Sequence, residues 1–260
     1  MTKNGGLMFV GRENELKILN RVFSSNRQES VLIYGRRRIG KTELIKKAIE
    51  DFEGEYIYYE AKQTTELSNV DSLSSLISDI LNLPRLGFQS MEEVFEFLFS
   101  YAKDKTMVFV LDEYPYLRSC MKGLDSILQT VIDKHLHTSH LKLILCGSYV
   151  DTMKALLEKQ NPLYGRIDLT LNLKPMDYYE SALFYPKFTE EDKVRLFSVF
   201  GGIPYYNRLI DAKKSVRENI IELIASPGAR LENEVSMYLN SEISKITNAN
   251  EVFEALAKGF

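Results

Sequence analysis

The chain has 260 residues, a hydrophobic content of 45% and a formal net charge of −3 at pH 7. This length suits one large domain or two small ones, and the charge gives no overall reason to expect binding to nucleic acid. Two cysteines do not make a disulfide framework, no apolar run has the length of a transmembrane helix, and no signal peptide opens the chain. We therefore expect a soluble, cytoplasmic protein without a membrane partner.

Short apolar runs alternate with helical periodicity through the first two thirds of the chain. Between the runs, apolar residues recur at helical spacing, as in Leu73, Leu76, Ile77 and Ile80. Strands that alternate with helices predict an α/β fold, here an αβα sandwich with a five-stranded parallel sheet whose ligands bind at the carboxyl ends of the strands. The runs typical of strands are residues 30–34, 55–61, 106–111, 141–146 and 167–173.

The first of these runs leads directly into a phosphate-binding loop. Gly35 and Gly40 bracket four residues, and Lys41 and Thr42 follow, which is the Walker A pattern G-x-x-x-x-G-K-[ST]. Main-chain N–H groups of such a loop surround a di- or triphosphate, the lysine reaches the β- and γ-phosphates, and the threonine hydroxyl can ligate Mg²⁺. The pattern predicts ATP or ADP with Mg²⁺, in contact with Gly35, Arg36, Arg37, Arg38, Ile39, Gly40, Lys41, Thr42 and Glu43.

The arginine triplet in the loop allows two interpretations. Arg36, Arg37 and Arg38 could recruit nucleic acid. Alternatively, the side chains face solvent or pair with acids such as Glu60, while their main-chain N–H groups serve the phosphate. One triplet is a poor electrostatic footprint for nucleic acid, which favours the second interpretation.

The third run ends in Asp112 and Glu113, which fits a Walker B motif. Asp112 would hold Mg²⁺ directly or through water, and Glu113 could activate the attacking water as a general base. Read in isolation, the pair could also be a strand that ends in solvated acids, but the Walker A motif on another strand favours the metal site. A base directly after Asp112 suits water activation better than a small-molecule kinase, and the sequence lacks the Asn-Lys-x-Asp motif of GTP binding.

Two further residues are candidates on weaker grounds. Ser148 follows the fourth run and could touch the γ-phosphate or the attacking water, although a simple turn serine is an equal alternative. Arg166 precedes the last run, in a loop that we expect at the nucleotide-binding edge, where a guanidinium could offset charge in the transition state. The alternative is a surface arginine. Cys146 reads as a buried small hydrophobe, and the spacing of His135, His137 and His140 does not favour a metal site.

After residue 173 the chain becomes helical in character. We predict a nucleotide-binding core at residues 1–173 and a small helical domain at residues 174–245, the segment that the family resemblance described below would make a lid. Residues 246–260 carry one amphipathic face and would begin a further domain, which suggests a fragment of a longer protein. The predicted helical stretches are residues 177–184, 190–200, 204–210, 216–225 and 231–243.

Six motifs, in order, resemble the archaeal-type P-loop ATPase family of the AAA+/STAND branch: FVGRENEL, YGRRRIGKTEL, FVLDEYPYL, LILCGSYVDTM, NPLYGR and FGGIPYY. The resemblance covers about residues 8–245 and implies an αβα core with a helical lid. It would place Val10, Gly11 and Arg12 beside the adenine and Ser148 at the sensor-1 position. It would also direct Arg166 at a γ-phosphate, in cis or from a neighbour, and Pro204 at the base or ribose.

The resemblance also implies a function. It predicts an Mg²⁺-dependent ATPase that couples ATP hydrolysis to movement of the lid against the core, with homo-oligomers as one possible assembly. The alternative is a signalling switch that holds ADP and hydrolyses little ATP. Family members continue into a winged helix, of which residues 246–260 resemble the start, and many into a nuclease-like region. A DNA or protein partner would be engaged through these parts.

Overall fold

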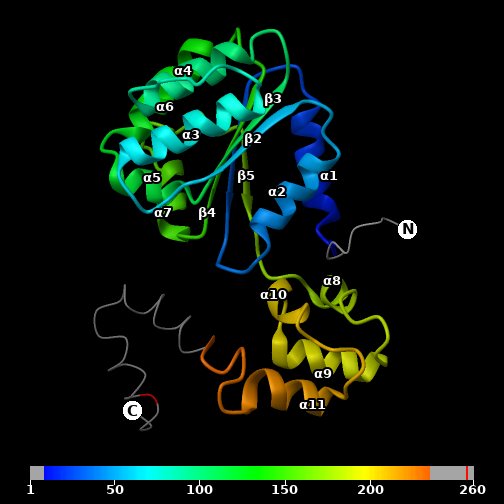
Figure 1. Ribbon diagram of the computed structural model, residues 1–260. Helices are drawn as coiled ribbons and strands as arrows, with labels where there is room; N and C mark the ends of the chain where they lie inside the picture. The colour runs from blue at the N-terminus through cyan, green and yellow to red at the C-terminus, as the bar shows by residue number, and fades with distance from the viewer. Residues whose placement is uncertain (1–8, 235–255, 257–260) are drawn as a thin grey trace. The chain divides into compact units, whose positions relative to one another are not determined.

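Five parallel strands form one sheet in the order β2-β3-β4-β1-β5 (Figure 1). The computed structural model describes residues 9–234 and Leu256. All five strands lie where the apolar runs predict them, and the predicted five-stranded parallel sheet is confirmed. The strands are β1 (Glu29–Tyr34), β2 (Glu55–Glu60), β3 (Met107–Asp112), β4 (Leu141–Gly147) and β5 (Leu169–Asn172).

The position of each strand in the sheet explains its composition. Every residue of β1, β3 and β4 is buried, because these central strands are covered on both faces. The edge strands β2 and β5 instead alternate between buried and more exposed residues. Continuous apolar runs therefore mark the centre of the sheet, where β1, β4 and β3 end side by side.

Helices cover both faces of the sheet, as an αβα sandwich requires. Figure 1 shows α1 and α2 on one face, and α3, α4 and α6 on the other. No helix among the described residues is both long enough and apolar enough to span a membrane. The helices of this unit are α1 (Glu13–Phe23), α2 (Lys41–Glu50), α3 (Glu66–Ile80), α4 (Met91–Tyr101), α5 (Tyr114–Cys120), α6 (Leu124–His135) and α7 (Val150–Lys154), with a 3₁₀ turn at Ala155–Leu157.

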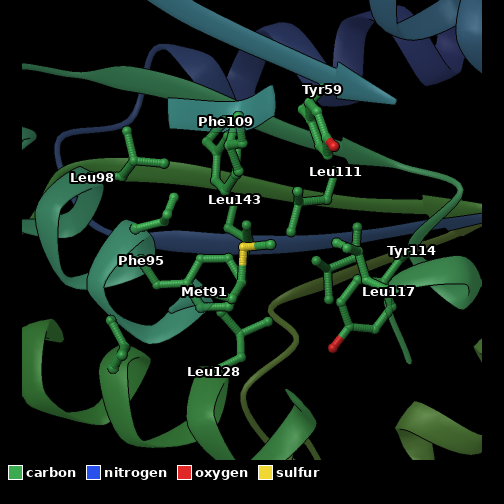
Figure 2. Packing of buried hydrophobic residues seen from close by; sticks show 14 of the residues in the cluster. Tyr59, Met91, Phe95, Leu98, Phe109, Leu111, Tyr114, Leu117, Leu128 and Leu143 are labelled. Atoms are coloured by element: carbon green, nitrogen blue, oxygen red, sulfur yellow. The ribbon is translucent and has the colours of Figure 1, made fainter. Parts of the chain in front are cut away.

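The core on the α4 side of the sheet is continuous and aromatic (Figure 2). Phe95 of α4 packs against Phe109 of β3 with ring centroids 6.4 Å apart. Leu143 of β4 and Leu128 of α6 are fully buried in the same cluster. Each such side chain stabilises the fold by about 1.5–3 kcal/mol relative to exposure. The core thus fixes the ends of β3 and β4, from which the site residues emerge.

A second compact unit begins at Met176, directly after the first unit ends at Pro175. Its described residues form helices and no strand. Tyr185, Leu196, Phe200 and Leu231 are its buried core. The helices are α8 (Tyr178–Ala182), α9 (Glu190–Phe200), α10 (Pro204–Asn207) and α11 (Val216–Ile220), followed by a π-helical turn at Ile221–Ala225. The end of the predicted lid and, apart from Leu256, the predicted start of a winged helix at 246–260 lie outside the described residues.

Candidate nucleotide-binding site

The Walker A loop follows β1 and packs tightly against the end of β5. The N–H of Leu173 donates to the carbonyl oxygen of Tyr34 at 2.7 Å. A Cβ on Gly35 would lie 2.5 Å from the carbonyl oxygen of Leu173, so only glycine permits this approach. Ile39 is fully buried beneath the loop. The loop is therefore a firmly supported part of the fold and not a loose connection.

Two residues of the loop have left-handed main-chain conformations before α2 begins. Arg38 and Gly40 have φ angles of 67° and 91°, both in the left-handed region. Such residues let successive N–H groups converge on an anion. Gly40 caps the amino end of α2, whose first residues are Lys41 and Thr42. The loop thus presents main-chain donors and a helix N-terminus together, which is the arrangement that binds phosphate.

Lys41 and Thr42 lie on the first turn of α2 and point to different partners. The Lys41 ammonium donates to the carbonyl oxygens of Gly35 at 3.0 Å and Arg36 at 3.3 Å, and the residue is only 7% exposed. The Thr42 hydroxyl donates to Asp112 Oδ2 at 2.9 Å. The structure therefore brings together the two residues that the sequence assigns to one Mg²⁺ ion.

The remaining predicted loop residues differ in exposure. Arg37 and Glu43 are exposed, whereas Arg36 and Arg38 are partly buried. Because the side chain of Glu43 belongs to the solvent face of α2, a contact of this residue with phosphate would come from its main chain. Contacts of these residues with a nucleotide stay predictions.

The Asp112 side chain accepts hydrogen bonds from three different residues of the site. It is 4% exposed, and its Oδ1 accepts the main-chain N–H of Glu113 at 2.9 Å. Its Oδ2 accepts the hydroxyls of both Thr42 and Tyr58. Cys146 is buried nearby, and burial, with the charge of Asp112, raises the pKa of its thiol well above the ordinary value. The carboxylate is therefore held in one orientation from three sides.

Tyr58 is a site residue that sequence reasoning missed. It lies within the strand predicted at residues 55–61, and its contact with Asp112 depends on β2 lying beside β3. Burial and the neighbouring charge of Asp112 raise the pKa of the Tyr58 hydroxyl, so it stays protonated as a donor. The sequence signals only a tyrosine near the end of a strand, a position that tyrosine commonly takes in sheets through packing alone.

Glu113 and Ser148 face one another across the ends of β3 and β4. Glu113 has a φ of 51°, an uncommon conformation for a residue other than glycine, and it caps the start of α5. Its two carboxylate oxygens accept the Ser148 hydroxyl at 3.0 and 3.1 Å, and one also accepts the Ser148 N–H at 3.4 Å. Strained residues of this kind cluster at functional sites. Ser148 thus contacts the candidate general base directly.

The residues before α1 are fixed by protein contacts. Gly11 and Arg12 both have left-handed φ angles, 69° and 61°. The Arg12 guanidinium is buried, and it donates to Glu15 at 2.9 Å and to the carbonyl oxygen of Lys174. Its side chain therefore ties the start of α1 to the chain that leaves β5. Contact of Val10, Gly11 and Arg12 with adenine stays a prediction.

The expected position of Arg166 was wrong. The N–H of Asp168 donates to the carbonyl oxygen of Ser30, near the start of β1, at 2.9 Å. Because β5 runs parallel to β1, the loop before β5 lies at the amino edge of the sheet. The Walker A loop follows the opposite end of β1, about 15 Å away along the strand. Arg166 therefore does not reach phosphate bound in its own loop.

Arg166 instead pairs with the end of α6. Its Nε and Nη2 donate to the two oxygens of Asp133 at 3.2 and 3.0 Å. This bidentate pair is partly exposed at the surface. A pair of this kind at the surface contributes little to the stability of the fold, so its loss would change the free energy of unfolding only slightly.

Pro204 has a local structural role in the second unit. It is the first residue of α10, where a missing N–H and a fixed φ are favourable. The preceding Gly202 leaves no room for a side chain, because a Cβ would lie 1.8 Å from the carbonyl oxygen of Met176. The GGIP segment is thus explained in part by packing, and contact of Pro204 with a nucleotide stays a prediction.

The histidines do not form a metal site in the described part of the chain, which holds no group of three or more His, Cys, Asp or Glu side chains placed for an ion. His135 Nε2 lies 2.8 Å from Glu96, so this histidine is occupied by a carboxylate of α4. A magnesium site at Thr42 and Asp112 would need few protein ligands, because Mg²⁺ keeps several waters and takes oxygens from the phosphates.

Comparison with known proteins identifies the family of the chain. A family described as an ATPase domain predominantly from Archaea matches residues 9–209. The chain belongs to this family. A curated relative, an uncharacterized protein of Methanocaldococcus jannaschii, is 34% identical over 253 residues, which are 97% of this chain and 55% of the relative. The ATPase domain and the residues around it thus span about half the length of that relative.

Solved structures share the fold at low sequence identity. The Walker-type ATPase of Pyrococcus abyssi aligns with a TM-score of 0.64 at 19% identity, covering 91% of this chain and 76% of its own. The ORC2 protein of Aeropyrum pernix, solved as ADPNP–ADP complexes, aligns with a TM-score of 0.59 at 19% identity, covering 91% and 66%. These similarities confirm that the chain has the fold of P-loop ATPases.

Proposed function

We propose that this ATPase domain binds ATP with Mg²⁺ and hydrolyses it. The observation that carries the proposal is the 2.9 Å hydrogen bond between Thr42 Oγ1 and Asp112 Oδ2, which joins the Walker A and Walker B residues. Two oxygens so close, one on a buried carboxylate, suit a small cation with oxygen ligands. Bound Mg²⁺ would neutralise charge on the β- and γ-phosphates.

Each side chain has a distinct role in this proposal. The Lys41 ammonium exchanges its loop carbonyl partners for β- and γ-phosphate oxygens. Thr42 and Asp112 hold the metal. Glu113 accepts a proton from the attacking water, since its carboxylate lies at the end of β3 next to Asp112. Pro204 and residues 10–12 would contact the nucleoside, as the family resemblance implies.

Hydrolysis would be coupled to movement of a helical lid, residues 174–245, relative to the core at residues 1–173. Support comes from the contact of Gly35 with Leu173, one residue before the predicted lid begins. A loop that moves when phosphate binds would act on this junction directly. DNA or protein partners would be engaged by further parts of a longer chain, since the curated relative is nearly twice as long as the aligned region.

Arg166 would act in trans if it acts on phosphate. Its place at the amino edge of its own sheet supports a role on the nucleotide of a neighbouring molecule. That role requires a homo-oligomer and the release of Asp133. An arginine supplied by a neighbour stabilises charge in the transition state of phosphoryl transfer.

One observation favours a second candidate, a switch that holds ADP and turns over slowly. The Glu113 carboxylate is engaged by the Ser148 hydroxyl and N–H, at 3.0–3.4 Å. A base so occupied must exchange a partner before it can accept a proton from water. This arrangement would make intrinsic ATP hydrolysis slow until a partner molecule displaces Ser148 from Glu113.

The test is ATP hydrolysis measured against protein concentration with Mg²⁺, together with the nucleotide content of the purified protein. For the ATPase we expect Mg²⁺-dependent turnover that a Glu113→Gln variant loses while it keeps nucleotide affinity. Lys41→Ala should lose nucleotide binding, and unchanged affinity in that variant would contradict the site assignment. Retained ADP with turnover near zero at every concentration would identify the switch.

A further inference from the structure

Tyr58 lies in the metal-binding part of the site but matches no motif. It stands on β2, where its register partner on β3 is Val110, two residues before Asp112. Residues i and j+2 of adjacent strands project from the same face, so the ring reaches diagonally across to the carboxylate. The hydroxyl donates to Asp112 Oδ2. The approach is therefore set by the pairing of two strands that share a buried core.

The Tyr58 ring also contacts a lysine of α2. The Lys46 ammonium of α2 lies 5.7 Å from the Tyr58 ring centroid, within the range of a cation–π contact. The tyrosine thus sits between the helix that carries Thr42 and the strand that carries Asp112. Its position joins the two elements from which the magnesium ligands come.

The decisive feature is that Asp112 Oδ2 accepts two hydroxyls at once, from Thr42 and from Tyr58. If the Thr42 oxygen turns to a metal ion, its hydrogen no longer points at Oδ2, and one acceptor position of that oxygen becomes available. The Tyr58 hydroxyl can stay in place throughout the exchange. Together with the Glu113 N–H on Oδ1, it would then keep the carboxylate from rotating about its Cβ–Cγ bond when the Thr42 donor is withdrawn.

We propose that Tyr58 is a positioning residue of the magnesium site, which orients Asp112 through a hydrogen bond while Thr42 changes partner. This inference rests on the proposed function, because it deepens the role of the same site. Groups that orient metal ligands in this way typically change metal affinity or activity 10- to 100-fold when removed. Because its role acts through Asp112, we expect nucleotide affinity in the absence of metal to be independent of Tyr58.

The strand supplies a matched control. Tyr56 lies two residues earlier on β2, projects from the same face and is 45% exposed. Its register partner is Val108, four residues before Asp112. A Tyr56→Phe variant therefore removes an equivalent hydroxyl from the same face of the same strand, at a greater distance from the carboxylate.

The test measures Mg²⁺-dependent binding and does not depend on turnover. The full chain, freed of bound nucleotide, is titrated with a fluorescent ADP analogue in EDTA, and the complex is then titrated with Mg²⁺. In Tyr58→Phe we expect the Kd in EDTA to stay within about twofold and the half-saturating Mg²⁺ concentration to rise about 10-fold. Tyr56→Phe should match the wild type in both measurements.

Three outcomes would overturn the proposal. One is an unchanged Mg²⁺ titration in Tyr58→Phe. Another is an equal loss of ADP affinity in EDTA and in Mg²⁺, which would mark Tyr58 as general support for the fold. The third comes from an Asp112→Asn background: Tyr58→Phe should add no further Mg²⁺ effect there, and an additive effect would show that Tyr58 acts independently of Asp112. If the wild type binds no ADP analogue, the proposed function itself fails, which is a different result.

Discussion

The carboxylate of Glu113 is bonded to Ser148 through both the serine hydroxyl and its main-chain N–H. The candidate base at the end of β3 is thus oriented by the first residue after β4. We propose that Ser148 influences the reaction by orienting Glu113. This relationship gives the position a testable role that a turn serine would not have.

Ser148→Ala should reduce ATP turnover about 10- to 100-fold, because misorienting a catalytic group by about 1 Å has an effect of this size. Nucleotide affinity should stay unchanged, since Ser148 contacts the base and not the loop. Steady-state hydrolysis and equilibrium binding of ADP measure the two quantities. Faster turnover in the variant would instead identify the contact as a restraint, in favour of the switch.

Gly35→Ala should damage the loop and the fold together. The added Cβ would meet the main-chain oxygen of Leu173 at 2.5 Å, and neither strand end can move without losing hydrogen bonds. We expect a loss of about 1–3 kcal/mol in the free energy of unfolding and weaker nucleotide binding. Gly87→Ala is the control, because its added Cβ meets nothing within 4 Å. Chemical denaturation of both variants distinguishes a local clash from a general intolerance to alanine.

Asp125→Ala should destabilise the protein by about 3 kcal/mol, because it leaves the buried Tyr114 hydroxyl and the partly buried Arg118 without their acceptor. Asp125 accepts the buried Tyr114 hydroxyl at 2.8 Å and pairs with Arg118 at 2.9 Å. Asp71→Ala removes a mostly exposed pair with Arg85 and should change stability by less than about 1 kcal/mol. Equal melting temperatures of the two variants would contradict the role assigned to Asp125.

The buried Lys142 predicts a pH dependence of stability. Burial lowers its pKa to about 8 from 10.5, even though its ammonium donates to Ser25 at 2.7 Å. Between these two values the unfolded state binds more protons than the folded state, so this group makes stability rise with pH across that window. The slope is at most about 1.4 kcal/mol per pH unit. In urea unfolding curves measured from pH 7.5 to 10, Lys142→Met should abolish this pH dependence of the free energy of unfolding. The control Lys103→Met, at an exposed position, should keep it.

Arg166 at the amino edge of the sheet predicts complementation between two inactive variants. Arg166→Ala keeps its own Walker A loop, and Lys41→Ala keeps the arginine that a neighbour could use. If the arginine acts in trans, an equimolar mixture should regain turnover that neither variant has alone, in proportion to protein concentration. A mixture as inactive as its components would leave the Asp133 pair as the only role of Arg166.

The sheet and the Walker residues could be predicted because their signals are local. Apolar runs mark central strands, and the glycines, Lys41 and Thr42 lie within one short segment of the sequence. The contacts of Tyr58 and Ser148 depend instead on which strands are neighbours in the sheet. No local sequence pattern predicts that order. Helix α1 precedes the first strand, and α5 follows the Walker B residues directly. Neither helix was predicted from the pattern of apolar residues.

The error at Arg166 has a different origin. A loop before a strand was assigned to the edge where strands end, although in a parallel sheet every strand begins at the other edge. The topology alone, once predicted, would have excluded that placement. Whether a residue precedes or follows its strand therefore decides at which edge of a parallel sheet it lies.

The tight junction between Gly35 and Leu173 has a mechanical consequence. The main chain is closely restrained at this point. The Leu173 N–H donates to Tyr34, and the Leu173 carbonyl oxygen packs against Gly35. The Arg12 guanidinium donates to the carbonyl oxygen of the next residue, Lys174. A displacement of Gly35 would therefore be felt at Leu173 and Lys174, which lie just before the first unit ends at Pro175. The chain thus leaves the sheet, after β5, directly beside the loop that would bind phosphate.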